Sequence, residues 1–161
     1  MSQHAVPPPP AFEPEFVDGL RELFEQRICF NQVLGLKLTE LAADHALGRI
    51  DMRPELIGHF SHQRLHGGVI SATLDAMAGM AVMAAIGARH MNEPIARRLE
   101  RFIKLGTIDL RVDYLRQATG ESFTARAEVL RLGSRVASTR MEFRGADGTL
   151  LATGAAAYIV S

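Results

Sequence analysis

The sequence predicts an α+β fold in which an antiparallel sheet curves around one long, buried helix. Residues 65–86 are apolar on nearly every side, as expected of a helix at the centre of a domain. Two strand-like segments precede this helix and four follow it. The dipeptides Gly133-Ser134 and Asp147-Gly148 favour hairpins between the last strands. Strands that return on themselves around a single apolar helix indicate an antiparallel sheet wrapped on that helix.

The segment before the central helix predicts one amphipathic helix and two strands. In residues 14–28 the apolar positions recur at spacings of three and four, which is typical of a helix with one buried face. Residues 34–41 and 46–52 are the predicted strands, and Pro54 ends the second one. The helix's apolar positions are Phe16, Val17, Leu20, Leu23, Phe24 and Ile28.

The central segment predicts a helix about 30 Å long, at roughly 1.5 Å per residue. Small residues recur along it, and Asp75 interrupts its apolar surface. The segment is therefore no convincing membrane span. After a basic connector over residues 89–104, strands are expected at residues 107–115, 121–132, 135–144 and 149–160.

Composition indicates one soluble domain. The 161 residues suit a single domain at 13–161 behind a disordered, proline-rich leader at 1–12. Lys plus Arg and Asp plus Glu each number 18, so no overall charge favours nucleic acid or an anionic membrane as a partner. One cysteine, Cys29, excludes an internal disulfide framework and fits a cytoplasmic location.

Polar residues gather just before the central helix, in HFSHQRLHGG at residues 59–68. Gly67 and Gly68 expose backbone amides at a helix N-terminus, where unpaired donors and the positive end of the helix dipole stabilise an oxyanion. The two glycines equally suit a tight strand-to-helix turn that carries no chemistry. Both interpretations of the glycine pair are open at this point.

Asp75 is the second candidate, because an ionised carboxylate in so apolar a segment is costly unless it is paired or hydrogen-bonded. A structural Asp bonded to the backbone or to an Arg is the alternative. Gly67 and Asp75 lie about 12 Å apart along one helix, whereas reacting groups must come within about 3–3.5 Å. We therefore expect two helices, packed antiparallel in a homodimer, to bring Gly67 of one chain to Asp75 of the other.

These residues resemble the hotdog-fold acyl-CoA thioesterases of the phenylacetate-pathway (PaaI-like) family over roughly residues 33–160. The resemblance lies in His66-Gly67-Gly68 followed by Asp75, in TIDLRVDYLRQ at 107–117 and in GTLLATGAAAYIV at 148–160. It implies a hotdog fold, an acyl-CoA substrate and no cofactor, with coenzyme A present only as part of the substrate. It also implies a homodimer, commonly assembled as a dimer of dimers.

Carried over by position, the resemblance gives each residue a role. Asp75 is the nucleophile or the general base, the Gly67 amide polarises the thioester carbonyl, and His66 orients that region. Thr107 replaces a Ser that positions water in some relatives. His59 stands near the place of a common Asn, and Gln117 replaces a Pro. Residues expected near the substrate are His59 and Gly68, with Arg116, Arg131 and Arg135 as candidates for the coenzyme A phosphates and Met77, Met80 and Met83 for an acyl tunnel.

Three alternatives follow from the same residues. Gly58-His59-Phe60 resembles the motif of hotdog hydroxyacyl dehydratases, but Thr73 stands where their acidic residue is expected. An acyl-CoA-binding protein would keep the groove without hydrolysis. A metal site of His59, His62 and His66 lacks an assigned carboxylate or open position.

Overall fold

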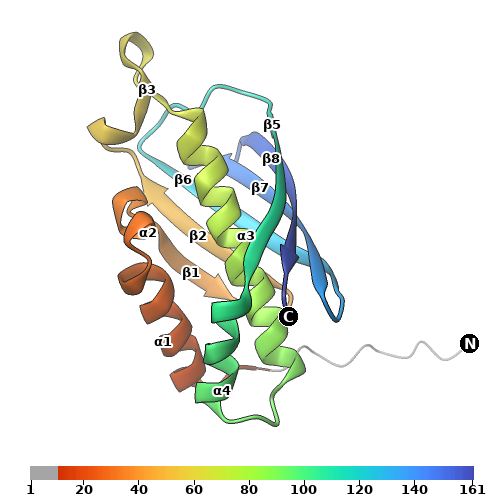
Figure 1. Ribbon diagram of the computed structural model, residues 1–161. Helices are drawn as coiled ribbons and strands as arrows, with labels where there is room; N and C mark the ends of the chain where they lie inside the picture. The colour runs from red at the N-terminus through yellow and green to blue at the C-terminus, as the bar shows by residue number, and fades with distance from the viewer. Residues whose placement is uncertain (1–10) are drawn as a thin grey trace, which may run out of the picture.

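A computed structural model describes residues 11–161, and residues 1–10 of the predicted leader at 1–12 lie outside them. Figure 1 shows a six-stranded sheet curved around the long helix α3, which confirms the predicted α+β architecture. The strand order is β1-β2-β6-β7-β8-β5, and every pairing is antiparallel. The strands are β1 (Lys37–Leu41), β2 (His45–Asp51), β5 (Gly106–Tyr114), β6 (Ser122–Leu132), β7 (Val136–Gly145) and β8 (Leu150–Ile159).

Helix α3 (Gly67–Arg89) forms the centre of the core. It packs on β2, β5, β6, β7 and β8. By length and composition it is apolar enough to cross a membrane, but 67% of its most apolar window is buried inside the protein, as in a core helix. A partly exposed stripe of mostly small residues runs along the helix away from the sheet: Gly68, Ser71, Ala72, Asp75, Ala76 and Gly79.

The N-terminal helix is broken where one continuous helix was predicted. Helix α1 (Pro14–Glu22) leads into a π-helical turn, η1 (Leu23–Arg27), and α2 (Cys29–Leu34) follows after Ile28. Gly35 adopts a left-handed conformation with φ of 68° and ends α2, so the following strand starts at Lys37 rather than at residue 34. The break places Ile28 between two helical turns. Phe12 also packs on Phe16, with ring centroids 5.1 Å apart.

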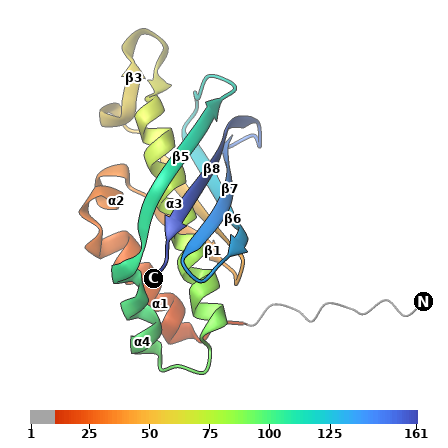
Figure 2. The same ribbon diagram turned by 45° about the vertical axis from the view of Figure 1, so that its right-hand side comes forward.

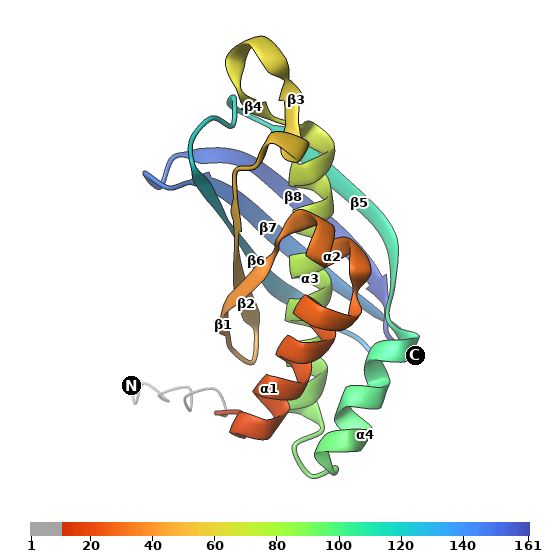
Figure 3. The same ribbon diagram turned by 90° about the vertical axis from the view of Figure 1, so that its left-hand side faces the viewer.

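The connector after α3 contains helical structure that periodicity did not predict. It forms α4 (Ile95–Glu100) and a 3-10 turn, η4 (Arg101–Lys104). Figure 3 shows α1 and α4 side by side over the lower half of α3, on the side away from the sheet. Arg98, only 1% exposed, joins them through an ion pair with Glu13 at 2.6 Å, and its guanidinium lies 4.5 Å from the centre of the Phe16 ring.

Strand β5 forms one edge of the sheet, as Figure 2 shows. It pairs only with β8 among the described strands, and a register shift lies between Thr107 and Asp109. That irregularity disturbs the simple alternation predicted for the strand, and Ile108 and Tyr114 are 56% and 54% exposed. An edge with unpaired backbone groups and exposed apolar side chains is suited to pairing with another chain.

A small hairpin, absent from the sequence prediction, precedes α3. It consists of β3 (Ile57–His59) and β4 (Arg64–Leu65), joined by the turn η3 (Phe60–His62), and it projects beyond the end of the sheet (Figure 1). The hairpin carries most of the histidine-rich segment directly into the start of α3.

Candidate active site

The N-terminus of α3 presents one free backbone amide. His66 is the N-cap, and its Nδ1 accepts the Gly68 N–H at 2.8 Å. The Gly67 N–H has no hydrogen-bond acceptor within residues 11–161. Because the neighbouring amide is already satisfied, Gly67 supplies the unpaired donor at the positive end of the helix dipole. His66 therefore caps the helix, and its role in orienting the substrate region stays a prediction.

Two neighbours hold this N-terminus closely. A Cβ on Gly58 would lie 2.7 Å from the Cα of His66, so only glycine allows the hairpin to approach the cap so closely. From β5, the Tyr114 hydroxyl donates to the Gly67 carbonyl at 2.8 Å. Tyr114 was not among the predicted site residues. Its contact ties the edge strand to the first turn of α3.

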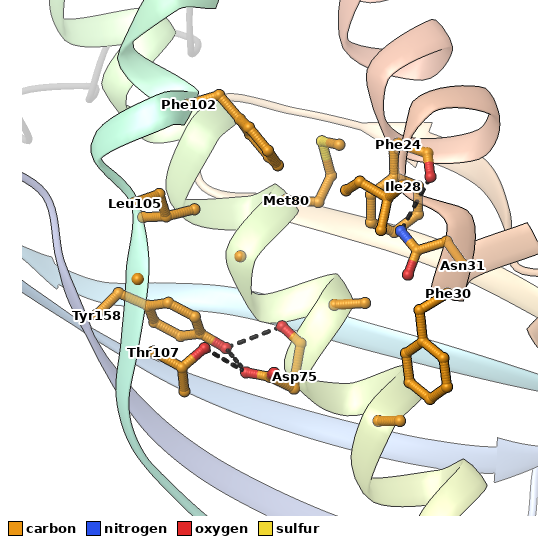
Figure 4. A pocket seen from close by; sticks show the side chains of 14 residues that line it. Phe24, Ile28, Phe30, Asn31, Asp75, Met80, Phe102, Leu105, Thr107 and Tyr158 are labelled. Carbon is orange, nitrogen blue, oxygen red and sulfur yellow. Dashed lines mark hydrogen bonds between the residues drawn. The ribbon is translucent and has the colours of Figure 1, made fainter.

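Asp75 receives two hydrogen bonds on the same carboxylate oxygen. Thr107 donates to Oδ1 at 2.9 Å and Tyr158 donates to Oδ1 at 2.7 Å, as Figure 4 shows. The Tyr158 hydroxyl also lies 2.9 Å from the Asp75 carbonyl. Thr107 and Tyr158 face each other across β5 and β8 in direct register. The pair fixes Oδ1, while Oδ2 has no hydrogen-bond partner in the described part of the chain.

Tyr158 was not among the predicted site residues. Its side chain is buried, and burial is the largest cause that raises its pKa far above the ordinary value near 10. The hydrogen bond to Asp75 and the charge of that carboxylate raise the pKa further, whereas Thr107 lowers it. Tyr158 therefore remains a neutral donor to Asp75 at physiological pH.

A cavity of about 260 Å³ opens beside Asp75 (Figure 4). Its walls come from α3, the N-terminal helical segment, η4 and the ends of β5 and β8. Of the three predicted tunnel methionines, Met80 lines the cavity, and Met77 and Met83 are fully buried elsewhere in the core. The large apolar lining side chains are Phe24, Ile28, Phe30, Met80, Phe102 and Leu105.

A second groove, of about 430 Å³, lies at the Gly67 end of α3. Gly67, Tyr114 and the predicted Arg116 line it, together with Arg64, which the sequence analysis did not select. The Arg116 side chain donates to the Leu150 carbonyl at 3.0 Å. Two guanidinium groups beside a free amide give this end of the helix a local positive charge that suits an anionic group.

The two halves of the predicted site are separate within one chain. Gly67 and Asp75 lie on the same continuous helix, about 12 Å apart by its rise per residue. They line different cavities. A reacting carbonyl must lie within about 3–3.5 Å of each group that acts on it. One carbonyl therefore cannot contact both Gly67 and Asp75 of the same chain.

The histidine-rich hairpin forms a small polar cluster of its own. Ser61 Oγ lies 2.9 Å from Nδ1 of both His59 and His62, and those two nitrogens are 3.2 Å apart. His66 is occupied by the Gly68 amide instead. No group of three metal-ligating side chains occurs in residues 11–161. The three histidines thus do not converge on a common point.

Three other predicted positions can be placed. Thr73 is 1% exposed and belongs to the buried side of α3, so the position expected to carry a dehydratase acid does not face the Asp75 cavity. Arg135 lies in the loop between β6 and β7 and lines neither cavity. Arg131, also near that loop, lines neither of them. The roles of Arg131 and Arg135 in substrate binding stay predictions.

Comparison with known proteins places this geometry in a family. A profile of the thioesterase superfamily matches residues 62–152. The medium/long-chain acyl-CoA thioesterase YigI of Escherichia coli K12 is 36% identical over 139 residues, which cover 86% of this chain and 90% of that protein. The YigI of Salmonella typhimurium LT2 is 37% identical over the same shares.

A solved structure agrees with these sequence matches. The crystal structure of a protein from Shewanella oneidensis related to the thioesterase superfamily has a TM-score of 0.85 and 38% identity to this chain, over 93% of this chain and 100% of that one. In this chain the fold shared with these proteins places a carboxylate beside an apolar cavity and an unpaired amide at a helix N-terminus, groups that suit thioester hydrolysis. The chain belongs to the thioesterase superfamily. The narrower PaaI-like assignment stays a prediction.

Proposed function

We propose that this protein hydrolyses acyl-coenzyme A to a free acid and coenzyme A, with an aliphatic acyl group in the cavity beside Asp75. The single observation that carries the proposal is the state of Asp75. One carboxylate oxygen is fixed by Thr107 and Tyr158, and the other, which lies at an apolar cavity, has no partner among the described residues. The printed name of the YigI relatives supports medium or long acyl chains.

In the proposed hydrolysis, a carboxylate and an amide act on opposite sides of the thioester carbonyl. Either Asp75 removes a proton from water, which attacks the carbonyl carbon, or Oδ2 attacks directly to give an anhydride that water then opens. In both cases the C–S bond breaks and the coenzyme A thiolate leaves and takes up a proton. The Gly67 N–H stabilises the oxyanion. Thr107, exposed beside Asp75, is placed to orient the water.

The separation of Gly67 from Asp75 supports a site shared by two chains. In a two-fold dimer with antiparallel α3 helices, Gly67 of one chain faces Asp75 of its partner, and two equivalent sites form. The small residues on the exposed stripe of α3 permit a close approach of helices, and the edge strand β5 offers unpaired backbone groups. We also propose a dimer of dimers as the complete assembly.

Coenzyme A is the anionic part of the substrate. We propose that it binds along the groove at Gly67, where Arg64 and Arg116 can neutralise its phosphates. His59 and Gly68 remain proposed neighbours of the substrate. Hydrolysis balances with water alone, so no cofactor is proposed, and a chelator is expected to leave the rate unchanged. Cytoplasm is the proposed location, and acyl-CoA is the proposed partner besides a second copy of the chain.

The test compares wild type with Asp75→Asn on a series of acyl-coenzyme A substrates, with release of free thiol as the readout. Removal of the acid–base group or nucleophile is expected to lower turnover by about 10²-fold or more. Asp18→Asn, an exposed acid on α1, is the matched control. Circular dichroism and gel filtration verify that fold and assembly persist. Normal turnover by folded Asp75→Asn contradicts the proposal, and substrate binding without thiol release by wild type indicates a binding protein.

A further inference from the structure

An apolar groove that is distinct from the groove at Gly67 adjoins the cavity beside Asp75. That groove, of about 540 Å³, runs between the α1–η1 segment and α4–η4 on the outer face of the helices. Leu23 and Ile28 line it on one side, and Ala96, Leu99, Phe102 and Ile103 line it on the other. Figure 3 shows the two helices that form its walls lying side by side.

Two side chains line both spaces. Ile28 and Phe102 belong to the lining of the Asp75 cavity and of the outer groove, so they form the wall between them. Figure 4 shows both projecting toward the cavity, from opposite sides. Each side chain is only partly buried. The boundary is therefore made of two partly buried side chains from separate segments.

The segment that carries Ile28 is held firmly in place. Ile28 lies between η1 and α2 in an extended conformation, and its N–H donates to the Leu23 carbonyl at 3.1 Å. Asn31, 2% exposed, donates from Nδ2 to the Phe24 carbonyl at 2.9 Å. The backbone bond from Ile28 to Leu23 closes the π-helical turn, and the Asn31 side chain ties α2 to that turn. The break in the N-terminal helix thus has a use, because it directs Ile28 toward the cavity.

The outer groove suits hydrocarbon rather than a charged group. Its apolar residues include Leu23, Leu99 and Ile103, of which Ile103 is 83% exposed. The charged residues in its lining are of both signs, so their net effect on an anion is small. The inner cavity of about 260 Å³ lies below the roughly 300–1,000 Å³ range of common ligand pockets, so long chains need additional space.

We propose that Ile28 and Phe102 are the end wall of the acyl cavity, and that longer acyl chains pass between them into the α1–α4 groove. The inference rests on the proposed thioesterase function. The occupant of the groove is the distal part of the substrate's own acyl chain, because the groove adjoins the cavity and only the Ile28 and Phe102 side chains are common to both linings. The wall therefore decides which chain lengths the enzyme prefers.

The test measures kcat/KM for saturated acyl-coenzyme A substrates of increasing length. Each additional buried methylene is expected to raise kcat/KM by up to about 4-fold while the chain still enters an apolar space. Phe102→Ala opens the wall and is expected to raise the ratio of long-chain to short-chain kcat/KM several-fold. Phe102→Trp narrows the passage and is expected to lower the same ratio.

A second variant tests the groove without altering the cavity. Ala96 is exposed on α4 and lines only the outer groove, so Ala96→Glu places a charge in the path of long chains alone. It is expected to lower kcat/KM for the longest substrates by about 10-fold and to leave the shortest unchanged. Ala146→Glu, at an exposed turn between β7 and β8, is the matched control.

The outcomes separate the two proposals. Parallel chain-length profiles for wild type, Phe102→Ala and Ala96→Glu overturn the end-wall proposal while thioesterase activity stands. Failure of wild type to release thiol from any acyl-coenzyme A overturns the proposed function itself. A long-chain defect confined to Ala96→Glu and Phe102→Trp, with the opposite change in Phe102→Ala, supports the end wall.

Discussion

Tyr158 donates its hydroxyl hydrogen to Asp75 Oδ1 at 2.7 Å, although 83 residues separate the two in the sequence. Thr107, which faces Tyr158 across the β5–β8 pair, donates to the same oxygen. The closing strand of the sheet thereby fixes the orientation of the carboxylate on the central helix. Oδ1 of Asp75 is thereby held in place, while Oδ2 has no hydrogen-bond partner in residues 11–161.

Tyr158→Phe removes one of the two donors and keeps the ring that fills the cavity wall. A hydrogen bond to a charged group contributes about 1.5–3 kcal/mol, so kcat is expected to fall by about 10- to 100-fold. KM is expected to change little, because the phenyl ring still lines the cavity. Steady-state kinetics on one acyl-coenzyme A gives both constants. A large rise in KM with unchanged kcat would show that Tyr158 serves substrate binding instead.

The raised pKa of Tyr158 also predicts how stability changes in alkali. The folded-state pKa lies above the unfolded value near 10, so the stabilising contribution is complete below pH 10 and is lost as pH rises toward the folded value. The free energy of unfolding is expected to fall above pH 10 by up to about 1.4 kcal/mol per pH unit from this group. Urea unfolding at several alkaline pH values measures the slope. Tyr158→Phe is expected to show a shallower slope, and equal slopes would contradict the assignment.

His66 caps α3 through the bond between its Nδ1 and the Gly68 amide. His66→Ala removes the acceptor and is expected to lower the free energy of unfolding by about 0.5–2 kcal/mol. His66→Asn keeps a side-chain acceptor at the N-cap and is expected to recover most of that loss. Urea denaturation of the three proteins measures the difference. If Asn and Ala destabilise equally, His66 acts by something other than capping.

The lowered pKa of Glu13 predicts that the protein loses stability in acid. Its hydrogen bond with Arg98 is the largest cause that lowers the pKa of Glu13 below its ordinary value of 4.5. The stabilising contribution is therefore present above pH 4.5 and is lost as pH falls through the folded-state value. Glu13→Gln is expected to lose less stability than wild type between pH 6 and about pH 3.5, measured by thermal unfolding. Glu93 and Asp147, whose pKa values are also lowered, keep their own acid dependence in both proteins. Identical pH dependence would show that the α1–α4 ion pair contributes nothing.

The sequence predicted the architecture because the strongest patterns are local. The apolar helix, the alternating second strand and the glycine turns each appear within short windows, and the structure has them within a few residues of the expected bounds. Asp75 was evident for the same reason, since a carboxylate in an apolar helix needs a partner wherever the helix lies.

The partners of Asp75 depend on non-local register, which a single sequence does not reveal. The irregularity between Thr107 and Asp109 decides that Thr107 faces Tyr158, and only the folded sheet shows it. Tyr158 gave one weak signal, a tyrosine in an otherwise small and apolar strand, because a buried tyrosine hydroxyl usually finds a partner. The six-residue helix α4 is too short for its periodicity to distinguish it from a connector.

Gly67 offers a matched pair of variants that isolates its amide. Gly67 is the first residue of α3, where proline is well tolerated, and the extended conformation of His66 (φ −67°, ψ 137°) accepts a following proline. Gly67→Pro removes the N–H, while Gly67→Ala adds a Cβ at an ordinary 3.4 Å from the Tyr114 ring and keeps the N–H. Loss of an oxyanion donor is expected to lower kcat by about 10²- to 10³-fold in Gly67→Pro alone.

The most direct measurement of a shared site mixes the two inactive chains, Gly67→Pro and Asp75→Asn, by co-expression or by unfolding and refolding them together. If each site takes its amide from one chain and its carboxylate from the other, a mixed dimer contains one intact site. Random pairing then restores about a quarter of wild-type turnover per chain. Equal amounts of the two separately folded proteins, assayed without exchange, give the background. Turnover that stays at this background in verified mixed dimers would contradict the shared site.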